Sequence, residues 1–248
     1  MKIIGIIPAR FASTRFPGKP LADIAGTSMV KRVYDKAEQA ESLSKVMVAT
    51  EDRKVFDHVK SFGGNVIMTS PDHRSGTDRC YEALRRDGKF YDFVINIQGD
   101  EPFISPKQID VLAASLSHQV ELATLVKRIG SPKDLRNPNV VKVILNFRKE
   151  AIAFSRSPIP FVRDYPEKDW LQHHTYYKHI GIYAYRSDIL DSITKLKPSV
   201  LEKAESLEQL RWIENDYAIK VTETALESKG IDTPEDLEVA LKEMEGRL

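Results

Sequence analysis

Through the first hundred residues, short runs of consecutive apolar residues alternate with segments whose apolar residues recur at helical spacing. Residues 2–7 form an apolar run, which is typical of a strand buried on both faces of a parallel sheet. Val30, Val33, Ala37 and Ala40 then recur at helical spacing. The same pattern continues with a strand at 46–49, a helix at 55–62, a strand at 66–68, a helix that begins at Ser75 and a strand at 93–97. This alternation predicts βαβ units with right-handed crossovers around a largely parallel sheet.

The pattern changes after about residue 120, where strands follow one another with little helix between them. The expected elements are strands at 121–129, 140–146, 151–155, 178–186 and 218–223, and helices at 202–215 and 233–247. We therefore expect an α/β fold of three layers, with a mixed, mostly parallel sheet and helices on both faces. We assign residues 1–248 to a single domain and interpret the excursion at 125–180 as a dimerisation contact.

Composition narrows the class of protein. The 248 residues are 42% hydrophobic and 29% charged, which suits a globular domain with a sizeable core. There are 37 Lys+Arg against 36 Asp+Glu, so the chain lacks the basic excess of a nucleic-acid-binding protein. A single cysteine, Cys80, permits no internal disulfide. No apolar stretch approaches the roughly 20 residues of a membrane span, and the first run is too short for a signal peptide. We expect a cytoplasmic protein with no nucleic-acid or membrane partner.

Three unusual loops, at 8–20, 50–52 and 98–102, follow predicted strands. Ligands of parallel α/β sheets bind outside the carboxyl ends of the strands, so these loops predict a shared site. The first loop carries three cations, Arg10, Arg15 and Lys19. Such fixed charge suits a polyphosphate substrate, because negative charge must be held while it is redistributed. The alternative is a solvated basic loop. Neither of the common Gly-rich phosphate-binding motifs is present.

Two aspartates are candidate metal ligands. Asp100 follows a buried strand and lies next to Gly99, where a carboxylate could hold Mg²⁺ together with phosphate oxygens. The alternative is an ordinary turn aspartate. Asp232 precedes a helix start in which Thr233 already serves as the expected N-cap, so Asp232 is not needed for capping.

Other candidates are weaker on their own. Ser75 and Gly76 begin a helix whose N–H groups could approach a nucleotide, although a simple helix cap explains them equally well. Glu202, Glu205 and Gln209 share a helical face, which without further information indicates an ordinary solvated surface. A lone histidine such as His179 is more often structural than catalytic.

The chain resembles a known family through motifs that span nearly its whole length. The first loop, Pro8-Ala9-Arg10 to Ser13 and Arg15 with Lys19, is similar to the signature of the sugar nucleotidyltransferases. Phe16-Pro17-Gly18-Lys19-Pro20-Leu21 resembles the 3-deoxy-manno-octulosonate (Kdo) cytidylyltransferases within that superfamily. The resemblance continues, in order, through residues 49–52, 75–79, 96–102, 154–160, 179–183, 207–211 and 230–237.

The resemblance implies a reaction in which CTP and Kdo give CMP-Kdo and pyrophosphate, for lipopolysaccharide biosynthesis, in a homodimer that uses Mg²⁺. It implies catalytic roles for Arg10, Lys19 and Asp100, and metal binding by Asp100 and Asp232. The implied nucleotide-binding residues are Ala9, Arg10, Ser13, Arg15, Lys19, Ser75, Gly76 and Gln98. The implied sugar-binding residues are Arg156, His179, Tyr183, Glu202, Glu205 and Gln209.

Four alternatives stay open at this point. A CMP-sialic acid synthetase would use the same fold and nucleotide with another acidic sugar, and an amino-substituted Kdo is a further candidate substrate. A nucleotide-binding protein without catalysis would not need both carboxylates. A structural protein would leave the loop of cations unexplained.

Overall fold

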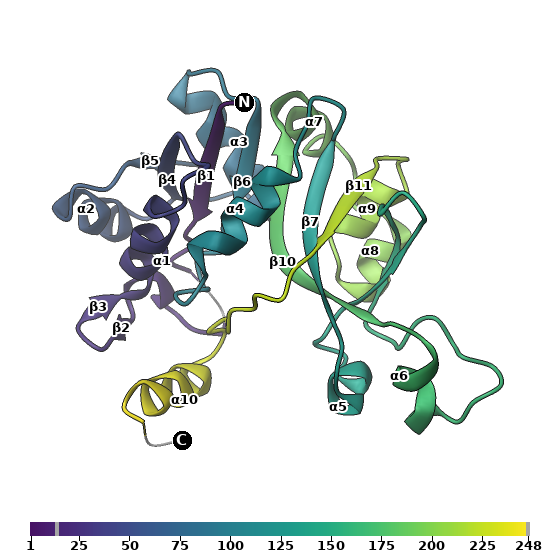
Figure 1. The fold of residues 1–248 in the computed structure, drawn as a ribbon. Coiled ribbons are helices and arrows are strands. Elements are labelled where there is room, and N and C mark those ends of the chain that lie inside the picture. Colours follow the sequence, from purple (N-terminus) through teal and green to yellow (C-terminus); the bar gives the residue numbers. More distant parts are fainter. Residues whose placement is uncertain (13–14, 247–248) are drawn as a thin grey trace. The chain divides into compact units, whose positions relative to one another are not determined.

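The computed structural model describes residues 1–12 and 15–246 (Figure 1). The chain divides into two compact units, each described separately below. The first comprises Met1–Ala114 and Ser228–Leu248, and the second Ser115–Glu227. The assignment of 1–248 to one functional domain and the dimer contact at 125–180 remain predictions. Among the described residues, no helix has both the length and the apolar character needed to cross a membrane.

The first unit is built on four parallel strands in the order β6-β1-β4-β5. Their bounds are β1 Ile3–Pro8, β4 Lys45–Thr50, β5 Val66–Met68 and β6 Phe93–Asn96. In the central strand β1, Ile6 lies beside Met47 of β4 on one side and Asn96 of β6 on the other. Residues Ile3, Ile4, Ile6 and Ile7 are all buried, which explains the unbroken apolar run in the sequence.

Successive strands are added on one side of β1 and then on its other side. The chain first proceeds outward from β1 to β4 and β5, and it then returns across β1 to form β6. Right-handed crossovers in opposite directions place helices on opposite faces of the sheet. Accordingly, α3 lies behind these strands in Figure 1, whereas α1 and α4 lie in front and pack against each other. The carboxyl ends of β1 and β6 therefore flank a topological switch point, where α/β sheets bind their ligands.

The helices of this unit are α1 Met29–Glu38, α2 Arg53–Ser61, α3 Gly76–Asp87, α4 Pro106–Ala114 and α10 Pro234–Met244. The short elements are η1 Lys19–Leu21, β2 Asp23–Ile24 and β3 Thr27–Ser28. Helix α10 begins as the sequence predicts. The Thr233 side chain caps it by accepting a hydrogen bond from Asp236 N, and the Asp236 side chain accepts one from Thr233 N. Pro234 occupies the first turn. Ile231, just before this helix, is buried with Ile24 and Met29.

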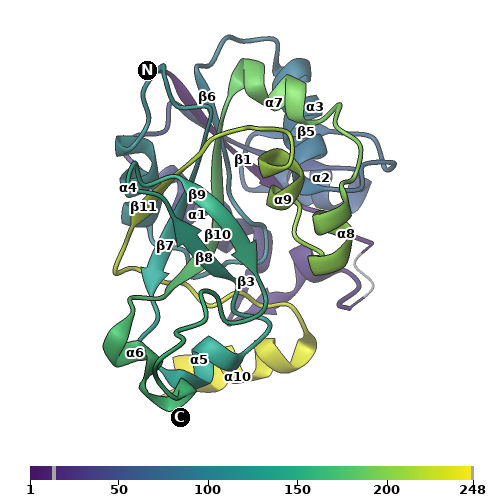
Figure 2. The ribbon, with the colours of Figure 1, turned by 90° about the vertical axis from the view of Figure 1, so that its right-hand side faces the viewer.

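The second unit contains a mixed sheet. Its strands are β7 Leu122–Arg128, β8 Lys142–Leu145, β9 Ala151–Ser155, β10 Tyr177–Arg186 and β11 Ile219–Glu223. Strand β7 pairs parallel with β11 and antiparallel with β10. Strand β8 pairs antiparallel with β10 and also antiparallel with β9, and these strands are seen in Figure 2. The register of β10 on β7 shifts between Ile180 and Tyr183. The predicted α/β class with a mixed, mostly parallel sheet is confirmed.

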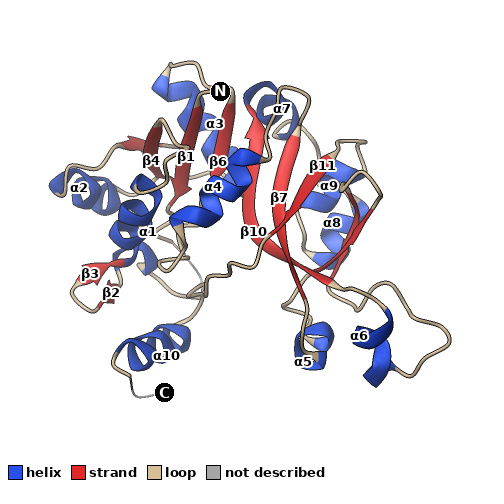
Figure 3. Cartoon of the chain, in the orientation of Figure 1, coloured by secondary structure: helices blue, strands red, loops and turns tan. Residues whose placement is uncertain are grey.

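The helices of the second unit are α5 Pro132–Arg136, α6 Trp170–His173, α7 Ser187–Ile193, α8 Val200–Glu205 and α9 Gln209–Ile213, with η2 at Glu167–Asp169 (Figure 3). The single helix predicted at 202–215 is wrong. The chain leaves the helix at Ser206, which has the left-handed φ of 52°, and resumes a separate helix at Gln209. Glu202 and Glu205 therefore lie on a different helix from Gln209.

Candidate active site

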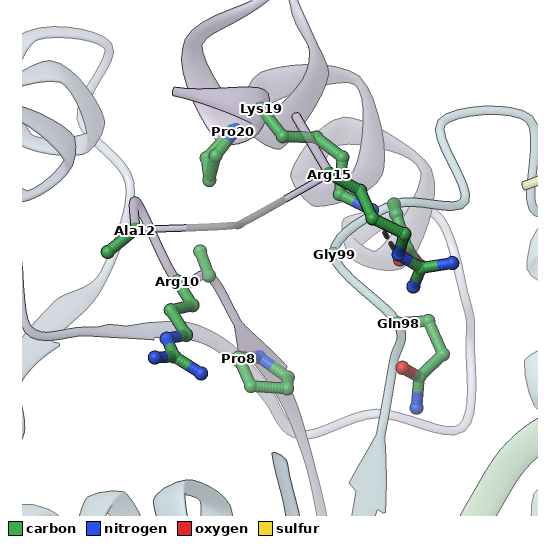
Figure 4. A pocket seen from close by; sticks show the side chains of 10 residues that line it. Pro8, Arg10, Ala12, Arg15, Lys19, Pro20, Gln98 and Gly99 are labelled. Carbon is green, nitrogen blue, oxygen red and sulfur yellow. Dashed lines mark hydrogen bonds and ion pairs between the residues drawn. The ribbon is translucent and has the colours of Figure 1, made fainter. Parts of the chain in front are cut away.

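A cavity of about 300 Å³ opens at the switch point between β1 and β6. The loops after these two strands line it with Pro8, Ala9, Arg10, Ala12, Arg15, Lys19, Pro20, Gln98, Gly99 and Asp100. In Figure 4 the side chains of Arg15 and Lys19 point to the same side, toward Gly99, whereas Arg10 extends beside Pro8. The three predicted cations thus surround one cavity, as expected for a site that binds a polyphosphate.

The Lys19 ammonium joins the two predicted metal ligands. Its Nζ lies 2.8 Å from Asp100 Oδ2 and 3.2 Å from Asp232 Oδ1, and it also donates to the carbonyl of Ile231 at 3.2 Å. The Lys19 side chain is only 13% exposed, so this pairing compensates for much of the hydration that the charge loses. Residues more than 200 positions apart in the sequence are brought together here.

Arg15 extends this cluster toward solvent. Its Nη2 lies 3.2 Å from Asp232 Oδ1 and its Nη1 lies 3.3 Å from Asp232 Oδ2. The side chains of Arg15 and Asp232 are 67% and 49% exposed, so the pair is hydrated and contributes little to stability. Arg15 is free to move toward an incoming anion at small cost.

The donor set suits Mg²⁺. Asp100 and Asp232 present carboxylate oxygens to a common point, and no group of three or more His, Cys, Asp or Glu residues suited to a metal occurs in the part of the chain that the structure describes. Mg²⁺ prefers oxygen ligands and usually takes one or two protein carboxylates, with substrate phosphates and waters for the rest. A pair of aspartates beside a loop that carries three cations therefore fits this ion better than Zn²⁺, which prefers nitrogen and sulfur.

In the second unit, β10 carries two of the predicted sugar-binding side chains. His179 Nε2 lies 2.9 Å from Thr124 Oγ1, and the His179 and Tyr183 ring centroids are 5.0 Å apart. Burial lowers the pKa of His179 to about 3, so the imidazole is neutral. The Tyr183 hydroxyl is buried and has no hydrogen-bond partner among the described residues, and burial raises its pKa. Because buried polar groups are normally hydrogen-bonded, the Tyr183 hydroxyl is suited to bind a polar group of a ligand.

Arg156 and Glu205 form a second group in this unit. Glu205 accepts from Arg156 N at 2.9 Å and from Ser155 Oγ at 2.7 Å, and the Arg156 Nε donates to the Glu205 carbonyl at 2.7 Å. Burial raises the pKa of the Glu205 carboxyl, but these hydrogen bonds outweigh it and hold the pKa below its usual value. Arg156 and Glu205 are therefore brought into direct contact.

Glu202 has a structural partner. Its two oxygens accept from Arg211, with Nε at 2.9 Å and Nη2 at 2.8 Å, and it also accepts from Ser199 N within the cap of α8. Its role in sugar binding remains a prediction, as does that of Gln209, whose side chain is mostly buried at the start of α9.

Comparison with known proteins decides the family. The chain matches the family described as cytidylyltransferase over residues 4–223. The 3-deoxy-manno-octulosonate cytidylyltransferase of Cytophaga hutchinsonii is 56% identical over 238 residues, which cover 96% of this chain and 95% of that protein. The protein of the same name from Parabacteroides distasonis is 56% identical, with 97% of each chain covered. This chain belongs to the 3-deoxy-manno-octulosonate cytidylyltransferase family.

A solved structure supports the same family. CMP:2-keto-3-deoxy-manno-octonic acid synthetase complexed with CTP is 42% identical, with a TM-score of 0.92 and complete coverage of both chains. A more distant likeness, to 4-diphosphocytidyl-2C-methyl-D-erythritol synthase from Anaerococcus prevotii, has a TM-score of 0.64 at 14% identity over 98% of both chains, and it shows the fold alone.

In this cytidylyltransferase, two glycines let the chain segments approach closely. A Cβ added to Gly99 would lie 2.6 Å from the Pro8 carbonyl oxygen, which no other residue could accommodate without movement of backbone. A Cβ on Gly76 would lie 3.3 Å from Pro8 Cγ, so the N-terminus of α3 reaches the end of β1 beside the cavity. Ser75 caps this helix by accepting from Asp78 N at 3.1 Å. The cap is thus observed, and nucleotide binding by Ser75 and Gly76 remains a prediction. Ser13 lies outside the described residues.

Glu101, which follows the cavity residue Asp100, is a largely buried acid that the sequence pattern does not single out. Its Oε2 accepts from Ser228 Oγ at 2.6 Å. Burial raises the pKa of Glu101 to about 7, and the neighbouring charge of Asp100 adds to the effect. The contact ties the loop after β6 to the segment before α10. Its only signal in the sequence is that it lies beside Asp100 within the matched block 96–102.

Proposed function

We propose that this chain transfers CMP from CTP to 3-deoxy-D-manno-octulosonate, with release of pyrophosphate, and so supplies CMP-Kdo for lipopolysaccharide biosynthesis. The observation that carries the proposal is the convergence of Lys19, Asp100 and Asp232 in a cavity lined by two further cations. The membership of the chain in the family supports the choice of nucleotide and sugar.

The protein's part in the reaction is to bind and to position. The anomeric hydroxyl of the sugar attacks the α-phosphorus in line with the departing pyrophosphate, so no covalent bond to the protein is required. Arg10, Arg15 and Lys19 hold the β- and γ-phosphates and stabilise the negative charge that develops on the leaving group. Arg156 pairs with the carboxylate of the sugar. The neutral imidazole of His179 forms hydrogen bonds with the hydroxyl groups of the sugar.

Asp100 and Asp232 would hold Mg²⁺. When bound, this ion neutralises the triphosphate and favours in-line displacement. Lys19 lies between the two carboxylates and keeps them close together, so the ligands are positioned by the fold of the first unit.

A cytoplasmic homodimer is part of the proposal. Among the described residues of the second unit, six large apolar side chains are highly exposed, and four of them lie within 125–180, namely Phe147, Ile152, Phe161 and Tyr165. Exposed apolar side chains that cluster in one segment favour an interface between subunits. Light scattering of the wild type and of Ile152→Glu tests this: the wild type should have twice the mass of one chain and the variant less.

Pyrophosphate release from CTP tests the activity. The assay uses Kdo, an amino-substituted Kdo and sialic acid in turn, each with and without Mg²⁺. Release with Kdo that depends on Mg²⁺ is the expected result. Release with another sugar alone would keep the mechanism and correct the substrate. Tight binding of CTP without release for any sugar would refute the enzymatic proposal.

A further inference from the structure

A buried ion pair lies behind the loop that lines the cavity. Arg79, in α3, is 2% exposed, and its Nη1 lies 2.9 Å from Glu51 Oε2 at the end of β4. The same Nη1 donates to Thr69 Oγ1 at 2.5 Å. Burial of a guanidinium is costly unless a charged partner and hydrogen bonds replace its hydration, and here both are present. The pair is therefore a fixed point of the first unit.

The other oxygen of Glu51 holds the cavity loop. Glu51 Oε1 accepts from the backbone N–H of Phe11 at 2.9 Å, across 40 positions of sequence. The carbonyl of Phe11 in turn accepts from Gly18 N at 3.1 Å. Phe11 thus connects the beginning of the loop to Gly18 near its end. Through Glu51, Phe11 is also connected to the buried Arg79.

The hydrogen bond from the Phe11 amide to Glu51 lies between two residues that line the cavity. Arg10 precedes Phe11 and Ala12 follows it, and both contribute to the cavity wall. Burial lowers the pKa of Arg79, Glu51 opposes this, and the charge of Arg10 lowers it further, which places Arg10 within electrostatic reach of the pair. Glu51 is therefore the carboxylate that balances the buried cation beside a substrate-binding arginine.

We propose that Glu51 is a positioning residue for the nucleotide: held by Arg79, it fixes the Phe11 amide and so presents Arg10 and the phosphate-binding loop to the triphosphate. The inference rests on the proposed function of this loop. It assigns a task to Glu51, which lies within the matched block 49–52.

The tie should act on the binding of CTP. Without an acceptor for the Phe11 amide, the loop must be ordered when the nucleotide binds, and this cost appears in affinity. Glu51→Ala should weaken CTP binding about tenfold, the effect expected from one partly buried donor left unpaired. The KM for the sugar should stay unchanged, because the sugar-binding candidates lie in the other unit.

Two further variants separate positioning from general stability. Glu51→Gln keeps an oxygen for the Phe11 amide and removes the charge, so it should bind CTP within about threefold of wild type even though its melting temperature falls. Asp87→Asn is the matched control: Asp87 is a largely buried acid of the same unit, paired with Lys45 and with the Tyr91 hydroxyl. It should lower the melting temperature and leave CTP affinity unchanged.

Calorimetric titration with CTP alone, with thermal denaturation of each variant, provides the test. Weak binding in Glu51→Ala with recovery in Glu51→Gln supports the inference. Equal CTP affinity in Glu51→Ala and the wild type, or equal weakening in Glu51→Gln and Glu51→Ala, would overturn it. If Glu51→Ala does not fold, CTP affinity in Glu51→Gln decides: a tenfold loss overturns the inference. A wild type that binds CTP but converts no sugar would refute the proposed function and leave this inference standing.

Discussion

Replacing Lys19 with methionine removes the ammonium group that we expect to contribute both to the stability of the fold and to CMP transfer. Its ammonium lies 2.8 Å from Asp100, 3.2 Å from Asp232 and 3.2 Å from the carbonyl of Ile231. Methionine keeps most of the length of the side chain and removes the charge and the donors. Without the ammonium, two carboxylates face each other across roughly 6 Å or less, because both oxygens contact the same nitrogen.

The magnitude follows from the exposure of the two acids. At about 6 Å, two unit charges repel by about 0.7 kcal/mol in water and by about 3 kcal/mol at an effective dielectric constant of 20. Asp100 and Asp232 are 31% and 49% exposed, so we expect about 1 kcal/mol of repulsion. The unpaired Ile231 carbonyl adds about 1 kcal/mol. Together these should lower the melting temperature by about 4–8 °C. Loss of a fixed cation beside the leaving pyrophosphate should lower kcat about 100- to 1,000-fold.

Thermal denaturation with and without MgCl₂, followed by turnover assays, measures both effects. The two carboxylates lose their internal cation, so Mg²⁺ should raise the melting temperature of Lys19→Met more than that of the wild type. Lys45→Met is the control, because Lys45 pairs with Asp87 away from the cavity. It should lower stability without a change in kcat or in the response to Mg²⁺. Turnover of Lys19→Met within about threefold of wild type would refute the assigned role of the ammonium.

Three other changes test separate parts of the molecule. Asp100→Asn should fold normally and lose at least about 100-fold in turnover, because the proposed Mg²⁺ site loses a charged ligand; near-normal pyrophosphate release would contradict this. Lys142→Met removes donors to the carbonyls of Asn137, Val140 and Arg156 and should cost about 2–3 kcal/mol in urea denaturation, whereas a loss below about 0.5 kcal/mol would contradict the importance of these bonds. The pKa of His179 is about 3 when folded and about 6.5 when unfolded, so the unfolded chain takes up the proton first and stability falls as pH drops below 6.5. Between pH 7.5 and 5 the wild type should therefore lose about 2 kcal/mol more than His179→Gln, and parallel pH curves would show that the histidine is not buried neutral.

The strands and the cavity loop could be predicted because their signals are local. A strand buried on both faces must be apolar throughout, as residues Ile3–Ile7 are, and the loop that follows must then lie at the carboxyl end of the sheet. Asp100 is predicted in the same way, since it follows the buried strand β6. The caps of α3 and α10 are also local, because the capping residue and its partner are three positions apart.

The contacts that tie distant segments together could not be predicted. Nothing in the spacing of Glu51 and Arg79 indicates that one carboxylate joins a buried guanidinium to the amide of Phe11. The helix break at Ser206 was missed for a different reason. The apolar pattern continues across it, no glycine or proline marks it, and tertiary packing overrides the local preference for a continuous helix.

The cluster around Lys19 suggests how a cation proposed to bind substrate can also be part of the fold. The Lys19 side chain is 13% exposed, so its charge has lost much of its hydration, and an unpaired charge in this position would be strongly unfavourable. Asp100 and Asp232 replace the lost hydration, but they are themselves partly exposed and bind through oxygens at ordinary ion-pair distances. Phosphate oxygens offer the same chemistry as these carboxylates, so Lys19 can exchange one set of anionic partners for another without passing through an unpaired state. On the proposed function, binding of the triphosphate would be an exchange of partners, and its affinity would depend on how firmly the loop is held in place before the nucleotide arrives.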